Sequence, residues 1–93
     1  MLTVNSYFND QVKSIAFQGE SLPATVGVIR SGEYQFDTRQ HETMTIISGT
    51  LLVQLPNSTE WLSYTAGESF EIDANDEFTV KASGDTAYLC TYA

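Results

Sequence analysis

The stretch that decides the fold is GEYQFDTRQHETMTIISG, residues 32–49. Apolar and polar residues alternate where it begins, with Tyr34 and Phe36 set between polar neighbours. Successive side chains of a β-strand point to opposite faces of a sheet, so an alternation with period two predicts a half-buried strand. The same alternation returns at residues 70–73 and 78–81, and the chain is therefore predicted to be all-β.

Turn-forming residues separate the predicted strands at intervals of about 8–12 residues, which is typical of β-sandwiches and barrels. Examples are Ser48-Gly49 and Ser83-Gly84-Asp85. We expect no long helix, and at most a single helical turn between Tyr7 and Val12. Strands are expected over residues 12–18, 25–30, 33–38, 43–48, 50–55, 60–64, 69–73, 77–82 and 86–92.

The composition fits one small acidic domain covering residues 1–93. A core of this size leaves a single subunit marginally stable, so we expect a homodimer. Twelve acidic against four basic residues give a formal net charge of −8. That charge repels nucleic acid and anionic membrane surfaces, and neither is an expected partner.

Several features predict a cytoplasmic protein. Met1 is followed by the largely polar stretch 3–6 rather than by the basic and apolar regions of a secretory signal. No run approaches the roughly 18 apolar residues of a membrane span. Cys90 has no second cysteine to pair with, which fits a reducing compartment, and we expect it to be buried in a strand rather than to act as a nucleophile.

Two stretches resemble the sequence motifs of cupins. Six residues separate Glu42 from Gly49, as in the first cupin motif. The second stretch begins at Gly67, but Asp73 and Asn75 stand where that motif has proline and glycine. The resemblance implies a single-domain cupin, an RmlC-like jelly-roll β-barrel.

The histidines that bind metal in cupins are missing from this chain. A metal-dependent cupin has two histidines shortly before the motif glutamate and a third after the second motif, whereas this chain has residues 35–38 and Phe78 there. His41 is the single histidine, so one subunit cannot supply a three-histidine site. We expect no metal and no other cofactor. A metal site built from Glu42, His41 and other acidic residues is an alternative.

Five segments resemble the pyrimidine/purine nucleoside phosphorylase family of small cupins. The resemblance implies an enzyme of the glycosyltransferase class, a pentosyltransferase. Its substrates would be diverse purine and pyrimidine nucleosides and inorganic phosphate, and its products the free base and α-D-ribose 1-phosphate. A non-catalytic cupin that binds a small ligand is the alternative. The segments are VKSI (12–15), VGV (26–28), GEYQFDT (32–38), MTIISG (44–49) and YLCTY (88–92).

Phosphorolysis of a glycosidic bond needs cations or amide donors for phosphate, negative charge near an oxocarbenium-like ribose, and a surface for the base. Lys13 and Arg39 are the phosphate candidates. Glu42 is expected to hydrogen-bond the ribose or to balance the developing positive charge, and Glu33 is a second carboxylate candidate. His41 could protonate the leaving base because it titrates near neutral pH. Each of these residues could instead be a solvated surface group.

Aromatic side chains are candidates for stacking on the base. Every base presents a π-face, so such a pocket would accept both ring types. Packing in the core or at a dimer contact is the other reading of these residues. The candidates are Tyr34, Phe36, Tyr88 and Tyr92.

Overall fold

The computed structural model describes all 93 residues, and every regular element in it is a β-strand. It contains no helix long and apolar enough to cross a membrane. In chain order the strands are β1 (Thr3–Tyr7), β2 (Val12–Gln18), β3 (Pro23–Ile29), β4 (Gly32–Asp37), β5 (Glu42–Ser48), β6 (Thr50–Gln54), β7 (Leu62–Thr65), β8 (Ser69–Ile72), β9 (Glu77–Ala82) and β10 (Thr86–Tyr92).

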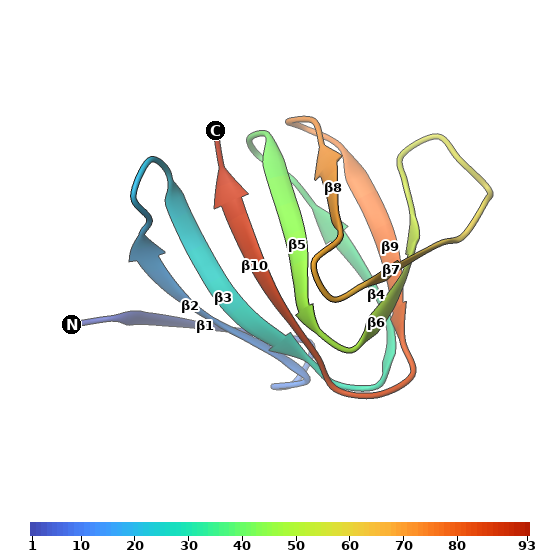
Figure 1. Cartoon of the computed structure of the whole chain (residues 1–93), viewed down its shortest axis with the longest axis horizontal. Helices are drawn as coiled ribbons and strands as arrows, with labels where there is room; N and C mark the ends of the chain where they lie inside the picture. The colour runs from blue at the N-terminus through green and yellow to red at the C-terminus, as the bar shows by residue number, and fades with distance from the viewer.

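The strands form two antiparallel sheets that face each other (Figure 1). The six-stranded sheet has the order β1-β2-β3-β10-β5-β8, and the four-stranded sheet has the order β4-β9-β6-β7. In Figure 1 the sheets approach each other at the bottom, where β3 leads into β4 and β9 into β10, and diverge toward the top. The all-β prediction is confirmed, although the two sheets are not hydrogen-bonded into one closed barrel.

The core lies between the two sheets and consists of the inward members of each alternating strand. Val12, Ile29, Leu51, Val53 and Val80 have no exposed surface. Burying a side chain of this size stabilises the fold by about 1.5–3 kcal/mol. The period-two pattern therefore specifies which face of each strand is inside.

Two motif positions have a clear backbone role. Gly49 has a φ of 94°, and a Cβ there would lie 2.9 Å from the carbonyl oxygen of Asp85, so the β5–β6 turn needs glycine. Asn75 has a φ of 59° where the cupin motif has glycine. Asparagine tolerates this left-handed conformation better than most residues, which explains how the second motif can depart from glycine.

The main error of the sequence prediction lies at the N-terminus. The segment after Tyr7 is not a helical turn but a tight connection between two paired strands, in which Val4 pairs with Ile15. Strand β1 was missed because most of its side chains are exposed and give little alternation. The expected strand at residues 60–64 instead begins at Leu62.

Candidate active site

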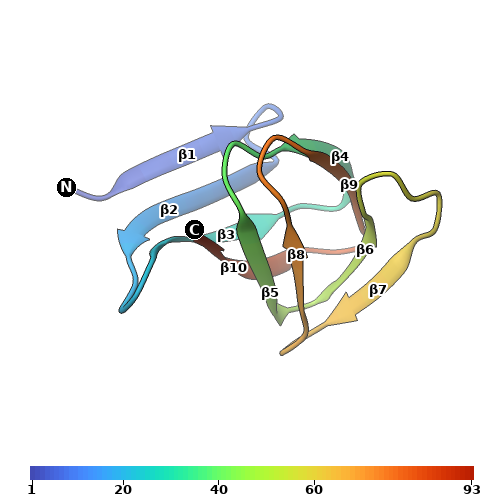
Figure 2. The same ribbon diagram turned by 90° about the horizontal axis from the view of Figure 1, so that it is seen from above.

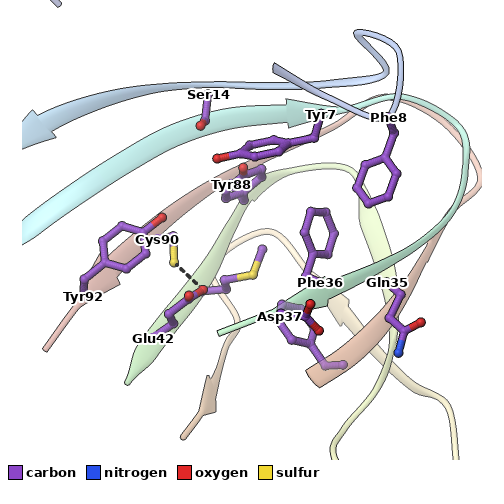
Figure 3. Close-up of a pocket in the computed structure, with 12 residues that line it drawn as sticks. Tyr7, Phe8, Ser14, Gln35, Phe36, Asp37, Glu42, Tyr88, Cys90 and Tyr92 are labelled. Carbon is purple, nitrogen blue, oxygen red and sulfur yellow. Dashed lines mark hydrogen bonds between the residues drawn. The ribbon is translucent and has the colours of Figure 1, made fainter. Parts of the chain in front are cut away.

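A cavity of about 250 Å³ lies between the two sheets, beside the turn that joins β1 to β2 (Figure 3). Strands from both sheets contribute to its walls, and most of its lining is hydrophobic. Its volume is slightly below the roughly 300–1,000 Å³ of typical small-molecule pockets. The lining residues are Tyr7, Phe8, Ser14, Gln35, Phe36, Asp37, Glu42, Met44, Phe78, Tyr88, Cys90 and Tyr92.

Strands β5 and β10 supply one polar cluster of this cavity. The antiparallel register pairs Tyr92 with Glu42 and Cys90 with Met44. Residues two apart on a strand share a face, so Tyr88, Cys90 and Tyr92 all point inward from β10. One carboxylate, one thiol and two phenols are thereby brought together on one side of the cavity (Figure 3).

Glu42 is the carboxylate in this group, and it has no cationic partner. Burial raises its pKa, and a hydrogen bond from the Cys90 thiol, 3.5 Å from Oε1, opposes that rise. None of the four ion pairs in the structure includes Glu42. A desolvated carboxylate without a positive neighbour is stabilised when a positive charge comes close to it.

The thiol and phenols around Glu42 keep their protons at neutral pH. Burial raises the pKa of Cys90 to about 12, and the Glu42 carboxylate adds to the effect. Burial also raises the pKa of Tyr88 to about 12, and it raises the pKa of Tyr92 as well. These groups are therefore hydrogen-bond donors in the cavity, and Cys90 is buried as expected and is not a thiolate.

The positions of the two tyrosines depend on β3. The hydroxyl groups of Thr25 and Tyr92 are 2.9 Å apart and hydrogen-bonded. Gly27 pairs with Tyr88, and a Cβ at Gly27 would lie 2.5 Å from the Tyr88 ring. Glycine in the Val26-Gly27-Val28 segment thus allows the ring of Tyr88 to lie flat against β3.

Aromatic rings form the other part of the cavity wall. Phe36 of β4 and Phe78 of β9 are stacked with ring centroids 5.6 Å apart. Phe8, in the β1–β2 turn, contacts Phe36 edge-on at 5.5 Å. These three rings form an apolar surface suited to a flat, weakly polar group.

Four of the residues predicted from the sequence line this cavity: Glu42, Phe36, Tyr88 and Tyr92. Tyr34 lies in the core instead, where its hydroxyl donates to the carbonyl oxygens of Arg30 and Ser31. Its ring touches Phe8 from behind the cavity wall, with centroids 5.0 Å apart. The structure thus brings part of the predicted aromatic set together with the predicted carboxylate.

The other predicted site residues lie outside the cavity lining, most of them in ion pairs. Lys13 is 4.0 Å from Asp10, and it lies on the face of β2 opposite Ser14. Glu33 pairs with Lys81 at 3.8 Å, and His41 Nε2 is 3.1 Å from the Glu71 carboxylate.

Arg39 differs from the other three basic residues because no ion pair includes it. Lys13, Arg30 and Lys81 each have an acidic partner. Arg39 is exposed in the loop between β4 and β5, which connects two residues of the cavity lining, Asp37 and Glu42. The loop is held by Thr38, whose buried hydroxyl donates to the Asp73 carbonyl oxygen at 2.6 Å. The unpaired cation therefore belongs to the loop that joins two residues of the cavity lining.

Sequence reasoning missed several lining residues. Ser14 and Met44 could have been found from the alternation, because they share a face with the buried Val12 and with Glu42. Tyr7 and Phe8 gave no such signal, since β1 itself was not predicted. No group of three or more histidine, cysteine, aspartate or glutamate side chains anywhere in the structure is placed so that it could hold a metal ion.

Comparison with solved structures defines the class of protein. An RmlC-like cupin from Shewanella frigidimarina superposes with a TM-score of 0.76, covering 98% of this chain and 82% of that one at 16% identity. The fold is therefore cupin-like, as predicted. A protein of unknown function from Vibrio parahaemolyticus superposes with a TM-score of 0.95 at 39% identity, over 100% of this chain and 99% of that one.

Sequence comparison identifies the family. Residues 2–92 match the family described as pyrimidine/purine nucleoside phosphorylase. A pyrimidine/purine nucleoside phosphorylase from Hahella chejuensis is 61% identical over 92 residues, which cover 99% of each chain. The chain belongs to the pyrimidine/purine nucleoside phosphorylase family, and the resemblance noted in its sequence is confirmed.

Proposed function

We propose that this protein is a nucleoside phosphorylase, which cleaves purine and pyrimidine nucleosides with phosphate to the free base and α-D-ribose 1-phosphate. Its membership of the family over residues 2–92 supports this activity. The observation that carries the mechanism is the cavity in which the half-buried Glu42, without a cationic partner, faces an aromatic wall.

Glu42 is proposed to act on the ribose. When the glycosidic bond breaks, positive charge develops on the sugar ring, as in glycoside hydrolysis. Burial without a cation leaves the ionised Glu42 poorly solvated, so its attraction to positive charge is strongest in the transition state. An interaction that strengthens in this way raises kcat rather than only lowering KM.

Phosphate is proposed to bind at the mouth of the cavity, near Arg39. A nucleoside would fill most of a cavity of about 250 Å³, which leaves the mouth for the second substrate. Arg39 is the basic residue without an ion pair, and guanidinium groups bind phosphate oxygens in a bidentate manner. The protonated phenols of Tyr88 and Tyr92 can donate to phosphate or ribose oxygens without adding charge.

We also propose that the reaction needs no metal and that the protein is a cytoplasmic homodimer formed from one domain per chain. The single histidine supports a metal-independent reaction, because a cupin triad needs three. Exposed apolar side chains on the outer face of the six-stranded sheet support dimer formation. Exhaustive chelation should leave the activity intact.

The decisive experiment is incubation of the purified protein with uridine, adenosine and inosine, each with and without phosphate. Release of base should require phosphate, and the sugar product should be ribose 1-phosphate rather than ribose. If no nucleoside loses its base when phosphate is present, the alternative of a ligand-binding cupin replaces this proposal.

A further inference from the structure

The β1–β2 turn has a feature that the fold alone does not require. Phe8, Asn9 and Asp10 have φ values of 53°, 54° and 66°, all in the left-handed region. A bulky residue such as phenylalanine is rarely found there, and each such residue costs on the order of 1–3 kcal/mol. Strain of this kind persists only where the surrounding structure holds it in place.

Several contacts hold this turn in its left-handed conformation. The amide of Gln11 donates to the Phe8 carbonyl oxygen at 3.1 Å, and the amide of Arg30 donates to the Gln11 carbonyl oxygen at 2.9 Å. The Ser6 hydroxyl donates to the Asp10 carboxylate, which also pairs with Lys13. Together these contacts fix the backbone at Phe8 and so set the direction of its side chain.

Phe8 is in the β1–β2 turn of the six-stranded sheet, which lies near β4 of the other sheet (Figure 2). Its ring contacts Tyr34 at 5.0 Å and Phe36 at 5.5 Å, the latter edge-on, and yet it is 43% exposed. Figure 3 shows the rings of Phe8 and Phe36 directed toward each other at the cavity wall. The exposed surface of Phe8 at the cavity is therefore available to a ligand.

The polar side chains that flank Phe36 in the cavity lining are those of Gln35 and Asp37. The Gln35 side-chain amide donates to the Glu77 carboxylate at 2.9 Å. A wall of phenylalanine rings binds by area and stacking, which discriminates weakly between flat heterocycles. The Glu42 carboxylate and the phenols of Tyr88 and Tyr92 lie on β5 and β10, whereas Asp37 and Tyr7 adjoin the rings of the wall in the chain.

We propose that Phe8 is the residue on which the base of the nucleoside stacks, and that the ribose then lies toward Glu42. The proposal rests on the proposed nucleoside phosphorylase activity and assigns a base-binding role to the β1–β2 turn. Phe36 and Phe78 complete the apolar surface beneath the base. Because stacking on phenylalanine is possible for every base, Phe8 would bind purines and pyrimidines alike, with a larger contribution for the larger purine.

The test compares the variants Phe8→Leu and Phe8→Tyr. Leucine keeps an apolar side chain and the same backbone strain but removes the π-face, whereas tyrosine keeps the ring. The matched control is Trp61→Leu. The ring of Trp61 lies 4.1 Å from Nζ of Lys81, a residue of β9, and Trp61 does not line the cavity. KM and kcat for inosine and uridine are measured at saturating phosphate.

Phe8→Leu should raise KM for inosine by roughly 5- to 100-fold, the effect typical of losing one base-stacking ring, and raise KM for uridine less. Its kcat should change little, because stacking acts equally on ground state and transition state. Trp61→Leu should keep wild-type KM, and Phe8→Tyr, which retains the ring, should be clearly less impaired than Phe8→Leu. A Phe8→Leu variant with wild-type KM, or a Phe8→Tyr variant as impaired as Phe8→Leu, would overturn the assignment to Phe8 and leave the phosphorylase proposal intact.

A binding measurement on the wild-type protein makes the test independent of catalysis. With ring-labelled phenylalanine, the base protons of inosine should show NOEs to the Phe8 ring, which is assigned by the signal missing from Phe8→Tyr. NOEs to other rings without any to Phe8 would refute the proposal. Inosine binding with these NOEs but without phosphorolysis would sink the proposed reaction and keep the base site.

Discussion

At the scale of single residues, Glu42 is partly buried and has no cationic partner, and both properties lower the stability of the fold. As the first residue of β5, Glu42 places its carboxylate in a cavity where burial raises its pKa, and the one group that donates a hydrogen bond to it is the weak donor Cys90. A soluble protein usually pairs or exposes such a group. That it is neither paired with a cation nor fully exposed is expected of a residue kept for catalysis.

The substitution Glu42→Gln tests this trade between stability and activity. A carboxyl whose pKa is raised in the folded state binds protons more tightly there, so stability falls as pH rises from its ordinary value of 4.5 through the raised value. Glutamine removes that penalty, and Tm at pH 8 should rise by on the order of a few °C, with little change at pH 4. Meanwhile kcat should fall by about 10²–10³-fold, since a charge that acts in the transition state is lost. Equal Tm shifts at both pH values, or an unchanged kcat, would contradict this account.

Arg39 and Lys13 allow a direct comparison of the two phosphate candidates. Arg39→Ala should raise KM for phosphate about tenfold or more, because charge-assisted contacts to phosphate contribute roughly 1.5–3 kcal/mol. Lys13→Ala should have a much smaller effect, since Lys13 is paired with Asp10 on the face of β2 opposite the cavity lining. Both values come from initial rates at saturating nucleoside. The reverse order of effects would move the phosphate site to Lys13.

At the scale of strands and turns, the alternation of apolar and polar residues predicted the strands that have one buried and one exposed face. The prediction for β2 has the observed bounds, and the core positions of β4, β8 and β9 follow from the same pattern. It could not predict β1, most of whose side chains are exposed, nor the left-handed turn at Phe8. The cavity was only half predicted for the same reason, since its polar side lies on strands with clear alternation and part of its aromatic side lies on a turn.

Strand β3 contributes to the site through Gly27, whose lack of a side chain leaves room for the Tyr88 ring. In Gly27→Ala, the new Cβ would lie 2.5 Å from the Tyr88 ring, so the ring must move toward the cavity. We expect a loss of stability of about 1–3 kcal/mol, as for other overpacked positions, together with a raised KM for nucleoside. Thermal unfolding and steady-state kinetics measure both. Gly84→Ala is the matched control, because a Cβ at Gly84 has nothing within 4 Å and should change neither quantity. If Gly27→Ala resembles the control, Tyr88 is not held in place by β3.

At the scale of the whole molecule, the two sides of the six-stranded sheet have different roles. Its inner face carries one side of the core and the Glu42, Tyr88 and Tyr92 side chains of the cavity lining. On its outer face, Val4, Ile15 and Val26 form a row across β1, β2 and β3, and Val28 lies next to it, all at least 41% exposed. A row of branched apolar residues in water is typical of a surface that is covered by another chain. This is why we expect two copies to associate through this sheet.

Val26→Glu places a charge at the centre of that row and should yield a monomer. Light scattering should give about twice the 10.3 kDa chain mass for the wild type and about that mass for Val26→Glu. Leu52→Glu, at 38% exposure on the outer face of the four-stranded sheet, is the matched control and should remain a dimer. A site complete within one chain predicts that a folded Val26→Glu monomer keeps its nucleoside KM. A wild type that is monomeric at micromolar concentration contradicts the dimer, whereas a folded monomer without activity would mean that the partner chain completes the site.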